Sequence, residues 1–287
     1  MAIWIGVSGW IYDDWRGPFY PADLPASRRL AYVGRQFSSV EINGTFYSLK
    51  TARAYRGWHE QTPPGFVFAL KGSRFITHNK KLAGVEAPLA NFFASGLLLL
   101  ADKLGPIVWQ LPATARFEPS RLERFLAALP RNTRDAARLA SQHDERVRDP
   151  GWPADGRPRR LRYALEVRHE SFFVPELVRI LRRFDVALVV SDAAGWRCVE
   201  EVTASFVYLR LHGHEQTYAS PYGNEALATW AASIRAWAAG GEPPSPRCIT
   251  GTRPRRRTSR DVYVYFDNDI GANAPRDALM LADLLRR

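Results

Sequence analysis

Charged and imidazole side chains stand two residues apart near the ends of several short apolar segments. Glu166 and Arg168 have this spacing, and so do Arg210 and His212. Alternate residues of a β-strand point to the same side, so each pair shares one face of its strand. Acidic, cationic and imidazole groups gathered in this way could bind an anion and transfer protons. The spacing therefore predicts a polar catalytic or binding face.

The same alternation extends to further segments of the chain. Glu41 and Asn43 share a face in one of them, and Lys71 ends another. Proteins rarely bury charged side chains without partners, and buried ion pairs add little stability. A network that only fixes strand register is the structural alternative, but we favour a functional site. Its catalytic candidates are Glu166, Asp192 and His212.

Loops that follow these segments carry further candidates for contact with a substrate. Trp10 lies in an aromatic-rich loop, and flat aromatic rings suit a sugar or a base. A lid that only packs over the fold is the alternative for this loop. Arg74 and His78 follow Lys71, and such a cationic loop suits an anion. Residue types and spacing give these substrate-binding candidates: Trp10, Glu41, Asn43, Lys71, Arg74, His78, Arg168, Arg210, Tyr218, Tyr222 and Asp267.

Eight short β-like segments alternate with helical patterns along the chain. Alternation of this kind predicts parallel strands covered by helices. We expect one domain over residues 1–287, a (β/α)8 barrel of the TIM type with its site at the C-terminal ends of the strands. An open sheet with a small second domain after about residue 200 is the alternative. The β-like segments are 3–8, 38–43, 66–71, 106–111, 162–167, 186–191, 206–212 and 261–266; the helical patterns are 27–36, 51–61, 89–104, 120–129, 176–184, 225–239 and 275–286.

Arginine carries most of the positive charge of this chain, whose formal net charge is +11. The excess is concentrated in two arginine-rich inserts at about 131–161 and 240–260. Both connect a helix to the next strand, which in a barrel places them on the N-terminal face, away from the predicted site. We therefore expect solvated inserts. Nucleic acid is an alternative partner that the charge alone does not favour.

Compartment and assembly are predicted from simple features. No apolar run is long enough to span a membrane, and the first residues form a β-like segment rather than a signal peptide. Cys198 and Cys248 lie far apart, as is typical of free thiols. We expect a cytoplasmic monomer without a membrane segment.

Several long motifs occur in order along almost the whole chain. They include GVSGWIYDDWRGPFYP, FSSVEINGTFYSL, ALEVRHESF and DVYVYFDND. Through these motifs the chain resembles the YecE-like family, also called domain of unknown function 72. The resemblance implies a TIM barrel and no assigned reaction. It also implies a site shared by the motif residues, which adds His169 and Asn268 to the substrate-binding candidates.

The candidates together predict an enzyme acting on a small or medium anionic substrate, phosphorylated or similar to a sugar or nucleotide, by hydrolysis or elimination. Lysine and arginine would hold the anion, Glu166 or Asp192 would be the base, and His212 the acid. No cofactor is predicted. One alternative is a metal-dependent hydrolase or isomerase, in which Glu166, Asp192, His212 and Asp267 bind a divalent ion, although the interleaved arginines oppose a cation. The other is a non-catalytic protein that binds nucleic acid or another polyanion.

Overall fold

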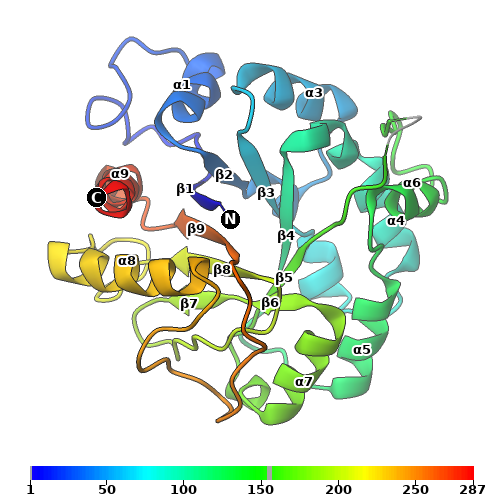
Figure 1. Cartoon of the computed structure of the whole chain (residues 1–287). Coiled ribbons are helices and arrows are strands. Elements are labelled where there is room, and N and C mark those ends of the chain that lie inside the picture. Colours follow the sequence, from blue (N-terminus) through cyan, green and yellow to red (C-terminus); the bar gives the residue numbers. More distant parts are fainter. Residues whose placement is uncertain (1, 154–156) are drawn as a thin grey trace. The chain divides into compact units, whose positions relative to one another are not determined.

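The computed structural model of the chain describes residues 2–153 and 157–287 (Figure 1). Parallel strands alternate with helices, which makes the fold an α/β fold of the barrel type, as the sequence predicts. Two compact units are distinguished: Met1–Glu41 with Ala187–Arg287 form unit 1, and Ile42–Val186 form unit 2. The organisation as a single domain stays a prediction.

The described residues contain nine strands rather than eight, because the sixth predicted segment is divided. Val186–Leu188 forms β6, and Val190–Asp192 forms β7. Each of the other seven segments gives one strand within two residues of its predicted ends. These strands are β1 (Ile3–Ser8), β2 (Ser39–Ile42), β3 (Val67–Lys71), β4 (Leu104–Gln110), β5 (Tyr163–Glu166), β8 (Phe206–Leu211) and β9 (Asp261–Phe266).

Helices follow most of the strands, close to the predicted ranges. In α7 (Pro175–Phe184), Leu177, Ile180 and Leu181 are buried, a spacing that gives the helix one apolar face. Proline begins α5 (Pro119–Ala128) and α7, at a position where a helix needs no N–H donor. The other α-helices are α1 (Arg29–Gln36), α2 (Gly44–Tyr47), α3 (Ala52–Gln61), α4 (Glu86–Ala94), α6 (Thr133–Ala140), α8 (Asn224–Ala238) and α9 (Asn273–Arg286). Shorter helical segments are η1 (Ala26–Arg28), η2 (Phe75–Asn79), η3 (Leu97–Lys103), η4 (Glu170–Phe172) and η5 (Ile270–Ala272).

Unit 1 contains β2, β1, β9, β8 and β7, paired in that order and all parallel. Residues in register on neighbouring parallel strands point to the same face of the sheet. Ser8 is in register with Glu41, and Arg210 with Tyr265, and these four side chains share one face. The opposite face is apolar: α8 and α9 pack against each other and against β9 (Figure 1).

Unit 2 contains β3, β4 and β5, again parallel and paired in that order. Gln110 is in register with Glu166, and Lys71 is in register with the residue two positions before Gln110. These three polar side chains therefore share a face. Trp109 points to the other face, where aromatic rings of α4 and α5 pack against it. The alternation places the polar ends of all three strands on one side.

The two arginine-rich inserts differ in structure. The first, 131–161, contains the helix α6, whose Ala136 and Ala140 are buried; its residues 154–156 lie outside the described residues. The second, 240–260, is fully described and contains neither helix nor strand. In the described part of the chain, no helix is both long and apolar enough to cross a membrane.

Candidate functional site

Glu41 stands at the centre of a buried polar network in unit 1. Its carboxylate accepts hydrogen bonds from the Ser8 hydroxyl (2.8 Å) and the Tyr208 hydroxyl (2.6 Å). Arg210 donates to it from Nε (3.2 Å) and from one terminal nitrogen (2.8 Å). Burial, with the nearby charge of Glu41, raises the pKa of Tyr208, so its hydroxyl remains a donor. Four hydrogen bonds thus satisfy a carboxylate that is 0% exposed, and the expected contact of Glu41 with a substrate stays a prediction.

The contact between Glu41 and Arg210 requires a strongly curved sheet in unit 1. Strands β2 and β8 are separated by β1 and β9, which in a flat sheet would place them about 14 Å apart. Side chains that meet across this interval show that the polar face is concave. The predicted inward orientation of Arg210 is therefore found within unit 1.

Arg210 also connects Glu41 to Asp267 and His212, which follow β9 and β8. Its guanidinium donates to Asp267 Oδ2 at 2.9 Å, and another nitrogen lies 3.5 Å from His212 Nε2. Arginine can only donate, so when the ring is neutral Nε2 is the acceptor and the imidazole proton sits on Nδ1. Nδ1 lies 2.9 Å from Asp267 Oδ2, but the angles do not make this a hydrogen bond, and the contact is electrostatic. Arg210 was expected to hold the substrate anion; its partners are instead carboxylates of the protein.

His212 is fully buried. The rings of Trp196 and Tyr218 lie 5.1 Å and 5.6 Å from the imidazole, and its exposed fraction is 0%. The imidazole is therefore enclosed by its neighbours, and the expected role of His212 as the acid stays a prediction. Tyr218 itself is 39% exposed with a φ of 67°, in the left-handed region that is unfavourable for tyrosine.

Asp269, which the sequence reasoning missed, is the second carboxyl group beside this network. Its Oδ1 is buried and has no hydrogen-bond partner among the described residues. Burial, assisted by the charge of Asp267, raises the pKa of Asp269 to about 8, although Tyr12 and Arg210 oppose the shift. The available signal was the second aspartate of DND, directly after the last strand.

Asp192 does not join the network. It is in register with Leu211 on β8, whereas the neighbouring Ser191 is in register with Arg210, so Asp192 points to the opposite face. There its carboxylate accepts a hydrogen bond from Tyr222 (3.0 Å) and lines a cavity of about 260 Å³ with residues of α8. The expected convergence of Asp192 and Tyr222 with Arg210 is therefore not found.

Asn268 and Trp10 have contacts within unit 1 that fix the backbone. Asn268 is fully buried and donates to the Ser220 carbonyl (3.0 Å) and to Asp277 (2.8 Å), which ties the end of β9 to α9. Trp10 is 9% exposed, and its carbonyl accepts a hydrogen bond from Tyr20. The substrate-binding roles expected of both residues stay predictions.

Cationic side chains gather in unit 2 around His78. The Lys71 ammonium lies 4.5 Å from the centre of the Phe46 ring, a cation–π contact, and the same ring meets His78 edge-on at 5.1 Å. Burial lowers the pKa of His78, and the charges of Arg74, Lys71 and Arg168 lower it further. We call these four residues, Lys71, Arg74, His78 and Arg168, the cationic cluster.

Two polar groups adjoin the cationic cluster on β4 and β5. Glu166 is fully buried, and one of its oxygens accepts from two nitrogens of Arg168, at 3.0 Å and 3.1 Å. Gln110, which the sequence reasoning missed at the end of PIVWQL, is 5% exposed, and its Oε1 has no hydrogen-bond partner among the described residues. The available signal was a polar residue near the end of an otherwise apolar β-like segment.

His169 and Asn43 are placed by the ends of short helices in unit 2. His169 Nδ1 accepts a hydrogen bond from the Ser171 backbone N–H at 3.1 Å, so its proton sits on Nε2 when the ring is neutral. Asn43 directly precedes α2, and its side chain makes no hydrogen bond to the first turn of that helix. The convergence of unit 2 residues with those of unit 1 stays a prediction.

Metal binding has no support beyond the sequence. Among residues 2–153 and 157–287, no group of three His, Cys, Asp or Glu side chains is arranged to hold an ion. The metal-dependent and nucleic-acid-binding alternatives stay predictions.

The fold and these clusters define an α/β protein of the barrel type with polar residues at the C-terminal ends of its strands. A family model described as "Protein of unknown function DUF72" matches residues 4–287. The chain belongs to this family, as its motifs indicated.

Relatives and solved structures agree with this assignment. The chain is 28% identical over 171 residues to UPF0759 protein YecE of Escherichia coli K12, covering 60% of this chain and 50% of YecE. It is 29% identical over 115 residues to UPF0759 protein YunF of Bacillus subtilis, covering 38% of this chain and 40% of YunF. The chain thus spans half the length, or less, of these curated relatives.

Two crystal structures of DUF72 proteins resemble it over nearly the whole chain. TM1631 from Thermotoga maritima has a TM-score of 0.75 at 22% identity, with 100% of both chains covered. EF0366 from Enterococcus faecalis has a TM-score of 0.71 at 16% identity, with 99% and 96% covered. At these identities the likeness shows the fold alone.

Proposed function

We propose that the protein is an enzyme that acts on a small or medium anionic substrate, phosphorylated or similar to a sugar or nucleotide, by hydrolysis or elimination. One observation carries this: two carboxyl groups in different surroundings follow β9. Asp267 shares the guanidinium of Arg210 with Glu41, while one oxygen of Asp269 is buried without a partner among the described residues. Neighbouring carboxyl groups in unlike environments can divide the roles of base and acid.

The proton transfers follow from these environments. In hydrolysis, Asp267 would accept a proton from the attacking water while Asp269 gives its proton to the departing oxygen. In elimination, Asp267 would take the proton from carbon, and Asp269 would again protonate the leaving group. Because the pKa of Asp269 is raised, it holds its proton at neutral pH and is suited to act as the acid. Arg210 and His212 act through Asp267 as positioning residues.

The cationic cluster supports the anionic character of the ligand. Lys71, Arg74 and Arg168 lower the pKa of His78, while the nearby Glu166, which pairs with Arg168, opposes them. A bound dianion would reverse this effect. Ammonium and guanidinium groups are the usual partners of phosphate, the latter by two parallel hydrogen bonds.

The anion-binding part can be tested without knowing the substrate. Inorganic phosphate added to the protein should raise the pKa of His78, measured from its imidazole signals by NMR. In Lys71→Met the phosphate affinity should fall about tenfold, the loss of one charge-assisted contact. Lys80→Met is the matched control, because Lys80 also lies over a ring, that of Phe75, at 6.0 Å, but is exposed outside the cluster. Equal losses in both variants would contradict a specific site.

The enzymatic part requires a substrate, found by thermal-shift screening of phosphorylated and sugar-like metabolites, since a ligand that binds the folded state raises its stability. Turnover is then followed by NMR of the products. Asp269→Asn should lower kcat by about 10²-fold or more with little change in substrate affinity. Full turnover by Asp269→Asn would refute its role as the acid.

A further inference from the structure

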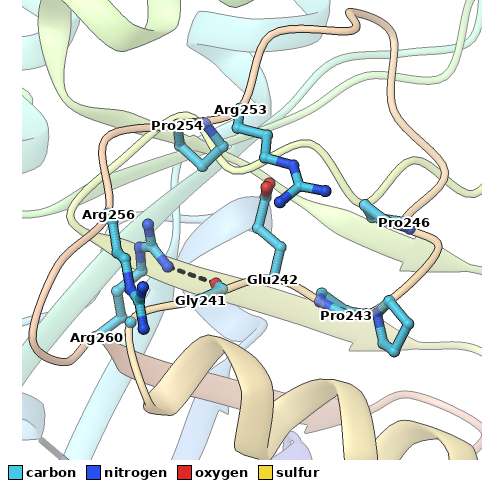
Figure 2. Close-up of a pocket in the computed structure, with 10 residues that line it drawn as sticks. Gly241, Glu242, Pro243, Pro246, Arg253, Pro254, Arg256 and Arg260 are labelled. Atoms are coloured by element: carbon cyan, nitrogen blue, oxygen red, sulfur yellow. Dashed lines mark hydrogen bonds between the residues drawn. The ribbon is translucent and has the colours of Figure 1, made fainter.

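The arginine-rich insert of unit 1 encloses a cavity of about 320 Å³. Figure 2 shows it between a proline-rich turn and the arginine loop that leads to β9. Its charged lining residues are Glu242, Arg253, Arg256 and Arg260, and four prolines supply much of the remaining wall. The volume lies at the lower end of the range of small-molecule sites, about 300–1,000 Å³.

Arg260 gives the pocket a fixed wall. It is 2% exposed, and its guanidinium donates to the Gly241 carbonyl at 2.7 Å (Figure 2) and to the Arg255 carbonyl at 3.1 Å. Gly240 has a φ of 79°, and a Cβ there would lie 1.9 Å from the Arg257 carbonyl oxygen, so only glycine fits. Both ends of the loop are therefore held at the end of α8, and the pocket is built into the fold.

The charge of this pocket is unbalanced. Three guanidinium groups face one carboxylate, so the lining residues carry a net charge of +2. Arg260 Nε is buried and has no hydrogen-bond partner among the described residues. Burial lowers the pKa of Arg260, and the charge of Arg257 adds to this, while Glu242 opposes it. Proline has no backbone N–H, so the guanidinium groups are the main donors that a ligand would meet.

We propose that this pocket binds a compact phosphate-type oxyanion, either a free ion or the phosphate of a small ester. Guanidinium groups present paired donors that match phosphate oxygens. Arg256 and Arg260 both line the pocket, and an anion among such like charges would relieve their repulsion. The rigid proline walls preorganise the site, which reduces the entropy lost on binding.

The pocket is separate from the carboxyl groups of the proposed active site. It precedes the first residue of β9, whereas Asp267 and Asp269 follow the last. A strand of this length spans about 20 Å. The inference therefore stands or falls independently of the proposed enzymatic function.

The test compares two double variants that each remove two positive charges from exposed positions of unit 1. Arg253→Gln with Arg256→Gln changes pocket residues, whereas Arg28→Gln with Arg255→Gln changes exposed arginines whose side chains do not line the pocket. Calorimetry with pyrophosphate, at fixed ionic strength, should show at least about a tenfold loss of affinity in the first variant and less than about twofold in the second.

Two further measurements distinguish binding in this pocket from general binding of anions to the arginine loop. Pyrophosphate should shift the Nε–H signal of Arg260 in NMR spectra. A comparison of the affinities for phenyl phosphate and for inorganic phosphate shows whether the pocket prefers an ester or a free ion. The proposal would be overturned by equal losses of affinity in the two double variants or by no binding of pyrophosphate to the unchanged protein. It would also be overturned if short single-stranded DNA displaced pyrophosphate and both variants were weakened alike. The last result would assign the loop to general polyanion binding.

Discussion

Replacing Asp269 by asparagine should protect the protein from a loss of stability that accompanies rising pH. In the folded state this carboxyl group binds its proton more tightly than in the unfolded chain, since its pKa is raised from 3.8 to about 8. Its stabilising contribution is therefore complete below about pH 4 and is lost as the pH rises towards about 8. The amide introduced by Asp269→Asn has no proton to lose in this range, so the variant escapes this destabilisation.

The magnitude follows from the same shift. Each pKa unit corresponds to about 1.4 kcal/mol of unfolding free energy. The stability lost between about pH 4 and pH 8 therefore has an upper limit of about 5.5 kcal/mol. Solvent reaches part of the side chain, which is not fully buried, and we expect about 2–3 kcal/mol after allowing for solvent screening. Urea unfolding of both proteins at several pH values between about 5 and 9 measures the difference directly.

The control is Asp23→Asn, because Asp23 is exposed on the surface. This variant should follow the unchanged protein at every pH. A difference in unfolding free energy between Asp269→Asn and the unchanged protein that does not vary with pH would refute the reasoning about burial.

Two further predictions concern the buried network and the sheet. Arg210→Gln should lower the free energy of unfolding by about 3–5 kcal/mol, measured in urea, because Glu41 and Asp267 lose their shared cation inside the protein; a loss below about 1 kcal/mol would contradict that burial. Gly6→Ala should destabilise by at least about 1–3 kcal/mol, since its Cβ would lie 1.9 Å from a backbone oxygen of β2. Gly57→Ala lies inside α3 with its nearest neighbour at 3.8 Å and should be at least as stable as the original protein, by up to about 1 kcal/mol. Equal destabilisation of the two glycine variants would exclude a tight contact between β1 and β2.

Much of the fold could be predicted because its signals are local. The alternation of residues 206–212 shows a strand with a polar and an apolar side, and β8 has both. Helix α7 was visible from the spacing of its apolar residues. The division of 186–191 into β6 and β7 could not be predicted, since all six residues suit a strand and the break depends on how each half pairs.

The candidate site was predicted less completely, because a role depends on partners that are distant in sequence. Arg210 was correctly placed on the polar face, yet its role changes through contacts with Glu41, 169 residues away, and Asp267, 57 residues away. Asp192 has the residue type of a catalytic base, but the pairing of β7 with β8 turns it to the other face.

The sequence by itself determined the alternation of strands and helices, the family, and the polar character of the strand ends. These properties depend on residue type and on a period of two or 3.6 residues, which a chain carries without folding. Only the tertiary structure decided which carboxyl groups are satisfied and which are not. Glu41 receives four donors while one oxygen of Asp269 receives none from the described residues, because burial and pairing arise only when distant segments pack together.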